Sequence, residues 1–243
     1  MTNLIEAIET RRSRRKYLPI ALDSASAKTL QKLISDITGK EQLKMQLIID
    51  DGNAFDGFKK SYGMFSGVRN YIALVGDRAD VLSMEKFGYY GEQLVLQATA
   101  LGLGTCWVGG TFDRKSCPIK LDENESIVCA ITVGATSPEL SKKEKLIRWT
   151  IHRKSKTAEQ MYTSDGSEPD WFRSGIKAVQ KAPSAVNRQP VIFAYDAGII
   201  TASVQDITVE GIAFDLGIAK LHFEIGAGGG EWVFGNGGKF FFH

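Results

Sequence analysis

The sequence predicts an α+β fold, because segments with helical periodicity and short β-prone segments share one chain. Residues 83–101 carry apolar side chains every three or four positions and are otherwise mostly uncharged, which is typical of a buried central helix. Residues 71–75, 127–133 and 191–195 are apolar and β-prone, which is typical of buried strands. A second long helix is predicted over 212–225.

The remaining elements of the first part follow from local signals. We expect a short amphipathic helix over 3–10, a second helix over 24–37 and a strand over 44–49. Residues 53–67 hold several aromatic side chains among glycines, which predicts a mobile loop with aromatic anchors. Glycines after residue 101 end the central helix.

The second part of the chain follows a similar plan, which suggests an internal duplication. A helix is predicted over 176–182, and residues 201–204 form a possible hairpin partner for the strand at 191–195. IEAIETRRS (5–13) matches IKAVQKAPS (176–184) at three of nine positions, and GTCWVGG (104–110) resembles GGEWVFG (229–235). Chance similarity is the alternative. We therefore predict a first half over 1–135, a polar, charge-rich linker over 136–170, and a second half over 171–243.

Composition narrows the class of protein. Of 243 residues, 43% are hydrophobic and 24% are charged, as in soluble globular proteins, and the net charge of +2 gives no global attraction to nucleic acid or membrane. No apolar run approaches the roughly 20 residues of a membrane helix, and the N-terminus lacks a signal pattern. Three scattered cysteines favour neither a disulfide framework nor a zinc site. We expect a cytoplasmic protein that binds no metal.

The stretch APSAVNRQP (182–190) is the first candidate site, because it places polar groups between a helix and a strand. Pro183 ends the helix, since proline lacks the amide and crowds the preceding turn. Between the two prolines lie Ser184, Asn187, Arg188 and Gln189, which can present donors and acceptors to a planar heteroaromatic ring. A plain turn between a helix and a strand would use the same residue types.

Three stretches together resemble the nitroreductase family of FMN-dependent oxidoreductases. They are ETRRSRRKY (9–17), GLGTCWVGGTF (102–112) and APSAVNRQP. The resemblance implies an α+β nitroreductase-like fold, with FMN as cofactor and NADH or NADPH as co-substrate. Without the other two stretches, the arginine-rich one would favour a solvated basic segment or a nucleic-acid patch.

The order of these stretches departs from the family, in which the APS loop follows the N-terminal arginines within a few dozen residues. One branch of the family carries two half-like domains in one chain, which mimic the usual homodimer. That arrangement implies one composite FMN site here, with the arginines from the first half and the loop from the second. Ala182 and Pro183 stand where the repeat places Arg11 and Arg12, so the second site should be vestigial and the protein a monomeric pseudo-dimer.

The resemblance also assigns the cofactor-binding residues. The phosphate would be met by arginines and a hydroxyl, and Arg15 or Arg12 would stabilise the negative charge that gathers at N1 of the reduced ring. Asn187 would form a hydrogen bond with the pyrimidine edge of the flavin. Gly109 and Gly110 would lie near N5 of the flavin, although a tight turn after a helix would also explain two glycines there. Arg153 resembles a late phosphate-binding arginine of the family, but its surroundings depart from the family pattern, because Ser155 replaces the expected proline. The full set is Arg11, Arg12, Ser13, Arg15, Gly109, Gly110, Arg153, Pro183, Ser184, Asn187 and Gln189.

No catalytic side chain is expected, because the flavin carries out the hydride chemistry. The implied activity is a ping-pong transfer of hydride from NAD(P)H through FMN to a small aromatic acceptor: a nitroaromatic, a quinone or another flavin. The loop at 53–67 would be the lid. Cys106 is expected to be a packed residue rather than a nucleophile. Two alternatives stay open, a flavin-binding protein without turnover and an RNA-binding module.

Overall fold

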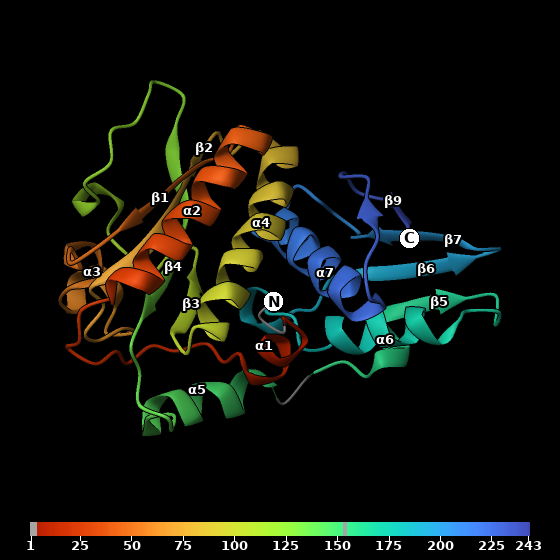
Figure 1. Cartoon of the computed structure of the whole chain (residues 1–243), viewed down its shortest axis with the longest axis horizontal. Coiled ribbons are helices and arrows are strands. Elements are labelled where there is room, and N and C mark those ends of the chain that lie inside the picture. The colour runs from red at the N-terminus through yellow and green to blue at the C-terminus, as the bar shows by residue number, and fades with distance from the viewer. Residues whose placement is uncertain (1–3, 153–154) are drawn as a thin grey trace. The chain divides into compact units, whose positions relative to one another are not determined.

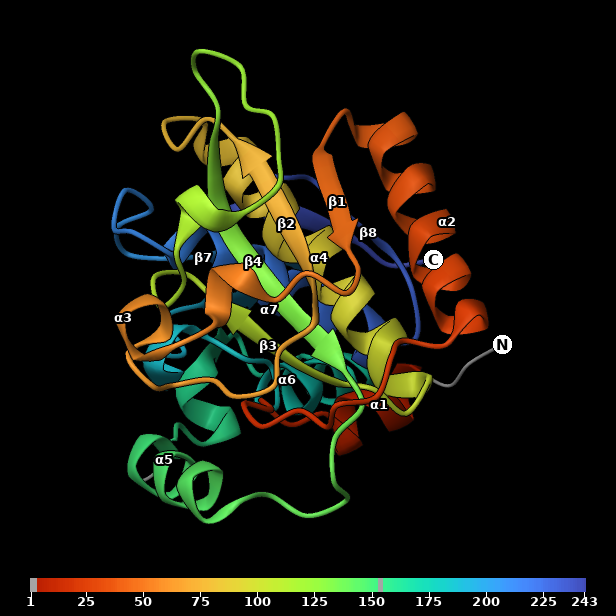
Figure 2. The ribbon, with the colours of Figure 1, turned by 90° about the vertical axis from the view of Figure 1, so that its left-hand side faces the viewer.

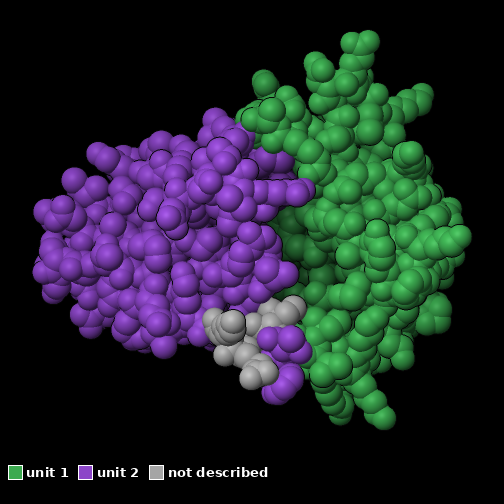
Figure 3. Space-filling view, turned by 180° about the vertical axis from the view of Figure 1, so that it is seen from behind, with its two compact units in different colours: residues 1–2, 10–80, 94–148 green, residues 3–9, 81–93, 149–243 purple. Residues whose placement is uncertain are grey.

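The computed structural model describes residues 4–152 and 155–243, and it divides into two compact units (Figure 3). Unit 1 contains Thr10–Asp80 and Leu94–Arg148. Unit 2 contains Val81–Gln93 and Trp149–His243, together with most of the first helix. Each unit has its own sheet and its own apolar core.

Unit 1 is built on a four-stranded antiparallel sheet (Figure 2). The strands, in sheet order, are β1 (Lys44–Ile48), β2 (Asn70–Gly76), β4 (Ser126–Gly134) and β3 (Gly104–Val108). The two central strands are buried along almost their whole length, as their continuous apolar runs predict. Phe55 packs against this sheet and meets Tyr71 edge to face at 5.3 Å between ring centroids.

Helix α2 (Ser24–Glu41) packs on β1, and local signals in the sequence set both of its ends (Figure 2). The carboxylate of Asp23 accepts hydrogen bonds from the amides of Ala25 and Ser26, which are unpaired donors of the first turn. Gln42 ends the helix in the left-handed conformation. Leu30, Ile34 and Ile37 form its buried face. Short helical turns fill the connections: η1 (Asn53–Phe55), α3 (Phe58–Ser61) and η2 (Arg114–Ser116).

Unit 2 is built on a five-stranded sheet in which one pair is parallel and the other pairs are antiparallel (Figure 1). Its strands, in sheet order, are β5 (Tyr162–Ser164), β6 (Ile192–Asp196), β7 (Ile199–Ser203), β9 (Gly238–Phe241) and β8 (Glu231–Trp232). Helices α6 (Asp170–Val179) and α7 (Ile212–Ala227) pack on each other, and their core centres on Phe172, Phe193 and Phe223. The unit also contains most of helix α1 (Leu4–Thr10) and the turn η3 (Ala158–Met161).

Helix α4 (Val81–Ala100) contributes its first part to unit 2, where it crosses α7 at close range. Glycines at the crossing, Gly88 and Gly217, allow this approach, because a Cβ at either position would collide with a backbone carbonyl of the other helix. Three polar pairs connect the same two helices: Glu85 with Lys220 at 2.5 Å, Tyr89 with Glu224 at 2.5 Å, and Glu92 with His222 at 2.9 Å.

The α+β fold class predicted from the sequence is confirmed, because the chain combines helices with two mainly antiparallel sheets. The stretch predicted as a linker, 136–170, contains α5 (Lys142–His152), η3 and β5 in the structure. The predicted loop at 53–67 contains η1 and α3. The unit boundaries also differ from 135 and 170, and the duplication stays a prediction. In the described part of the chain, no helix has the length and apolar character to cross a membrane.

Candidate functional site

The arginine-rich segment after α1 is extended, and this conformation separates its side chains into two sets. Ser13 pairs with Thr105 of β3, and Lys16 pairs with Ser66, both as parallel bridges. Side chains alternate along extended backbone, so every second residue shares a face. The sequence pattern alone does not reveal this alternation, because five cations in six positions place arginine on both faces.

The first set consists of Arg11, Ser13 and Arg15. Each of these side chains influences the thiol of Cys106 in β3, the arginines by their charge and Ser13 by a hydrogen bond. Burial raises the pKa of the Cys106 thiol, while the Arg15 and Arg11 guanidiniums and a hydrogen bond with Ser13 oppose part of this rise. Cys106 is 4% exposed. Cys106 is thus a packed side chain, as the sequence predicted.

Arg14 lies on the opposite face of the segment and links it to residues 136–144 by hydrogen bonds and an ion pair. Its guanidinium donates to the hydroxyl of Thr136 at 2.8 Å and to the backbone oxygens of Ser137 at 2.8 Å and Glu139 at 3.1 Å. It also pairs with the carboxylate of Glu144 at 3.3 Å. Arg14 is therefore fully engaged within unit 1. Arg12 is exposed and donates to the backbone oxygen of Arg11 at 2.7 Å.

Glu144, at the start of α5, fixes the backbone that carries these arginines. Its Oε1 accepts from the amide of Arg15 at 2.7 Å and from the amide of Lys16 at 3.2 Å, and its Oε2 accepts from the amide of Ser141 at 2.7 Å. Burial alone would raise the pKa of this carboxyl, but the hydrogen bonds from Arg15, Ser141 and Lys16 together outweigh burial and lower the pKa to about 2. Glu144 is thus ionised at neutral pH, and it holds the arginine segment in place.

The guanidinium of Arg15 differs from that of Arg14, because no hydrogen bond or ion pair engages it within the described residues. It is partly buried and lies on the same face as Ser13 and Arg11. A guanidinium that lacks a carboxylate partner and stands beside a second guanidinium and a hydroxyl can bind a phosphate or another anion.

Gly109 and Gly110 follow β3 directly and are exposed. Neither has a positive φ, and a Cβ at either position would meet no atom within 4 Å in the part of the chain that the structure describes. The fold of unit 1 therefore does not itself require glycine there. Arg114 donates to the backbone oxygen of Gly109 and fixes the course of the segment.

The APSAVNRQP loop follows α6 in unit 2, and hydrogen bonds within that unit hold it. Ser184 Oγ accepts from the amide of Gln189 at 2.9 Å. The Gln189 carboxamide accepts from the amide of Lys156 at 2.8 Å and donates to the backbone oxygen of Gln180 at 3.4 Å. Gln189 is 5% exposed, so its side chain supports the loop from inside.

Three residues of this loop have left-handed backbone conformations without being glycine. They are Val186 at φ 47°, Asn187 at φ 58° and Gln189 at φ 47°. Such conformations are costly, above all for a β-branched residue, and they persist where the surroundings enforce them. The loop includes the turn η4 (Ala185–Asn187), whose outer side chain, Val186, is 72% exposed. The Asn187 carboxamide donates to the Ser155 hydroxyl at 3.0 Å.

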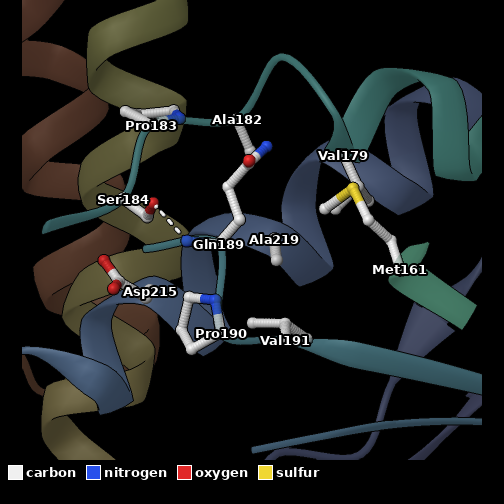
Figure 4. Close-up of a pocket in the computed structure, with 10 residues that line it drawn as sticks. All are labelled: Met161, Val179, Ala182, Pro183, Ser184, Gln189, Pro190, Val191, Asp215 and Ala219. Carbon is white, nitrogen blue, oxygen red and sulfur yellow. Dashed lines mark hydrogen bonds between the residues drawn. The ribbon is translucent and has the colours of Figure 1, made fainter. Parts of the chain in front are cut away.

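A small, mostly apolar cavity lies behind the loop, and one of the residues that line it is acidic (Figure 4). Pro183, Ser184, Gln189 and Pro190 line it from the loop, and Asp215 lines it from the first turn of α7. Asp215 is 4% exposed. Burial raises the pKa of its carboxyl to about 7, although a hydrogen bond from the Ala185 amide and the charge of Arg188 oppose the rise.

The structure brings together some of the predicted residues and not others. Arg11, Ser13 and Arg15 share a face in unit 1, whereas Arg12 does not, and Ser184 and Gln189 are bonded in unit 2. Arg153 lies outside the described residues. Among the described residues, no cluster of His, Cys, Asp and Glu could hold a metal ion.

Sequence reasoning missed Arg14, Glu144 and Asp215. For Asp215 a signal was present, since an ionisable residue in the otherwise apolar first turns of a long helix is unusual. For Glu144 none was visible, because it lies among lysines in a polar stretch.

Comparisons with known proteins show the family and the fold of this chain. The model of the family described as "Putative TM nitroreductase" matches residues 3–227, nearly the whole chain. A solved structure described as a "putative nitroreductase", from Thermotoga maritima, has a TM-score of 0.68 and 21% identity, and the match covers 98% of this chain and 92% of that one. This likeness shows the fold. No curated protein matches the chain.

Two further solved structures are similar over part of the chain. An FMN-dependent nitroreductase from Clostridium difficile has a TM-score of 0.45 and 19% identity, covering 62% of this chain and 98% of that one. A nitroreductase with bound FMN from Bacteroides fragilis has a TM-score of 0.43 and 14% identity, covering 57% of this chain and 91% of that one.

Proposed function

Because the chain belongs to the family described as "Putative TM nitroreductase", we propose that it is an FMN-dependent oxidoreductase. When bound, FMN would supply the redox chemistry between NADH or NADPH and a small aromatic acceptor, such as a nitroaromatic, a quinone or another flavin. Donor and acceptor would use the same pocket in turn, which is a ping-pong scheme. The protein's part is to bind the cofactor, orient it and control access.

The observation that carries this proposal is the guanidinium of Arg15, which has no hydrogen bond or ion pair within the described residues and shares a face with Ser13 and Arg11. A phosphate monoester brings up to two negative charges and three acceptor oxygens. Two guanidiniums and a hydroxyl on one face match that donor requirement. Glu144 does not compete for Arg15, because it binds the backbone amide of this residue and not its guanidinium.

The second unit would contribute the APSAVNRQP loop. Asn187 would bond the pyrimidine edge of the flavin, and Pro183 and Ser184 would contact the ring and the ribityl chain. Gln189 supports the loop from inside. The open space at Gly109 and Gly110 leaves room for a planar ring near that backbone.

The segment at 53–67 would be the lid and would select the acceptor. Two of its aromatic side chains are exposed in unit 1, Phe58 at 76% and Tyr62 at 66%. Large apolar side chains at such exposure are available to cover a flat aromatic molecule.

The test begins with FMN affinity, measured by quenching of flavin fluorescence. Arg15→Ala should weaken binding by about 1.5 to 3 kcal/mol, because a charge-assisted hydrogen bond is lost, and Asn187→Ala by about 1 kcal/mol. Lys16→Ala is the matched control, since it removes the same charge from the adjacent, exposed position and should have little effect. Equal losses for Arg15→Ala and Lys16→Ala would argue for diffuse attraction and against a phosphate site.

The second step is anaerobic mixing of FMN-loaded protein with NADH and, separately, with NADPH. Bleaching of the flavin absorption by either is the expected result. If FMN binds and neither nucleotide bleaches it over minutes, the protein is a flavin carrier or sensor. If FMN does not bind at all, the proposal is wrong.

A further inference from the structure

Within the described residues, the carboxyl of Asp215 makes one hydrogen bond, and this bond joins it to the APSAVNRQP loop. Its Oδ1 accepts from the amide of Ala185 at 2.9 Å. Its Oδ2 is buried and has no hydrogen-bond partner within the described residues. A buried polar atom without a partner is costly and calls for a functional explanation.

The surroundings of this carboxyl disfavour a negative charge. Among the described residues that line the cavity behind the loop, Asp215 is the one titratable residue (Figure 4). The charged group that acts on it is Arg188, which is itself exposed, and the N-terminal end of α7 adds a partial positive charge. These two influences do not compensate for burial, because the pKa of Asp215 still rises to about 7.

The hydrogen bond from Ala185 lies directly before the strained part of the loop. Val186 and Asn187, the next two residues, both have left-handed backbone conformations. These persist only while neighbouring contacts enforce them. On the side of α7, Asp215 supplies the hydrogen bond that anchors this part of the loop.

We propose that Asp215 is a positioning residue for the cofactor loop: in its neutral form it holds the loop in the FMN-binding conformation, and its ionisation releases the loop. The inference rests on the proposed function, since it concerns the same FMN site. It assigns a role to a residue that would touch neither flavin nor substrate.

The direction of the pH dependence follows from proton binding in the two states of the loop. With the loop in place, Asp215 keeps its proton up to about pH 7, whereas a released and hydrated carboxyl loses it near the ordinary pKa of 3.8. Rising pH therefore favours the released loop across this interval and has no further effect above it. FMN affinity should fall as the pH rises from 5.5 to 7.5.

The experiment compares FMN dissociation constants at pH 5.5 and pH 7.5 in the parent protein, Asp215→Asn and Asp196→Asn. The parent should lose up to about tenfold in affinity through this group. Asp215→Asn is permanently neutral and can still accept from Ala185, so it should lack that loss and keep tight binding at pH 7.5. Asp196→Asn removes an exposed carboxylate of the same unit and should behave as the parent. Ionisation of the FMN phosphate affects all three proteins equally.

Hydrogen exchange at the Ala185 amide, measured without FMN, gives an independent readout. Its protection factor should fall with pH in the parent and stay constant in Asp215→Asn, while Asp215→Ala should lose protection at both pH values. The inference would be overturned if FMN affinity and Ala185 protection depended on pH in the same way in the parent and in Asp215→Asn. The proposed FMN-binding function would not be affected by that result. Absence of FMN binding in the parent at both pH values, with Ala185 protection that does not change with pH, would reject both the inference and the proposed function.

Discussion

Glu144 determines which arginine of the segment remains available to a ligand. One carboxylate accepts from two consecutive amides, those of Arg15 and Lys16, and pairs with the guanidinium of Arg14. The backbone between these contacts cannot rotate without breaking them. Arg14 is thereby held inside unit 1 and Arg15 is held on the opposite face. The availability of Arg15 is therefore a consequence of a residue 129 positions away in the sequence.

Glu144→Gln should lower the free energy of unfolding by about 2 to 3 kcal/mol at pH 7, because Arg14 would keep its charge without a buried partner. The folded-state pKa of about 2 lies below the ordinary 4.5, so this stabilisation is complete above pH 4.5 and disappears as the pH falls toward 2. Urea unfolding at pH 7 and pH 3 should show the difference between parent and variant shrinking at the lower pH. Glu139→Gln, at an exposed ion pair with Lys145, should change little. A difference of the same size at both pH values would contradict this account.

Residue types could be predicted at the site, but their pairing could not. The run RRSRRK indicates a basic segment, which the family resemblance assigns to a phosphate, and the structure adds that a parallel bridge between Ser13 and Thr105 decides which side chains share a face. A bridge between positions so distant in sequence leaves no local pattern. Asp215 is different, because a lone carboxylate in an apolar helical stretch is visible in the sequence.

Among the elements, the crossing of α4 and α7 depends most strongly on side-chain size. Both helices are long and largely buried, and their backbones approach where each has a glycine. The polar pair of Glu85 and Lys220 lies at the same crossing and is almost fully buried. Removing one member of such a pair leaves an uncompensated charge, so the pair fixes how the two helices align.

Gly217→Ala should lower the free energy of unfolding by about 1 to 3 kcal/mol, because the new methyl group would collide with the backbone oxygen of Glu85. Gly39→Ala is the matched control in α2, where a methyl group would meet nothing within 4 Å. It should raise stability by about 0.5 to 1 kcal/mol, since alanine loses less backbone entropy in a helix. Thermal denaturation of the parent and both variants measures these changes in stability. A neutral Gly217→Ala would mean that the helices can separate at little cost.

Elements with strong periodicity were predicted, and those that depend on tertiary pairing were not. The predicted helix over 24–37 and strand over 71–75 are present with small shifts at their ends. β3 was missed because GTCWV lies between glycines and resembles a turn, whereas in the structure β4 supplies its hydrogen-bonding partner. α5 was missed because its sequence, KKEKLIRWTIH, is dominated by charge in a stretch that otherwise looks like a linker.

At the scale of the whole molecule, the proposed duplication predicts one complete FMN site and a second, vestigial one. Ala182 and Pro183 stand where the proposed repeat places Arg11 and Arg12. Residues 229–235, which resemble the glycine segment of the first half, make hydrogen bonds to other residues of unit 2. The amide of Gly235 donates to Glu85 at 2.7 Å, and Lys220 donates to the backbone oxygens of Val233 and Gly235. A second flavin would have to displace these contacts.

We therefore predict one FMN per chain and no obligatory dimer. A homodimer with equal surfaces builds equal sites by symmetry, whereas two fused halves can diverge and leave one site without its cations. A phosphate at the second position would lose its hydration without gaining a guanidinium, which makes binding unfavourable. Light scattering combined with flavin absorption should give a mass near 26.7 kDa and at most one FMN per chain. A stable dimer with two FMN per chain would contradict the prediction. Arg15→Ala is the control, because it should abolish most of the flavin signal and leave the mass unchanged.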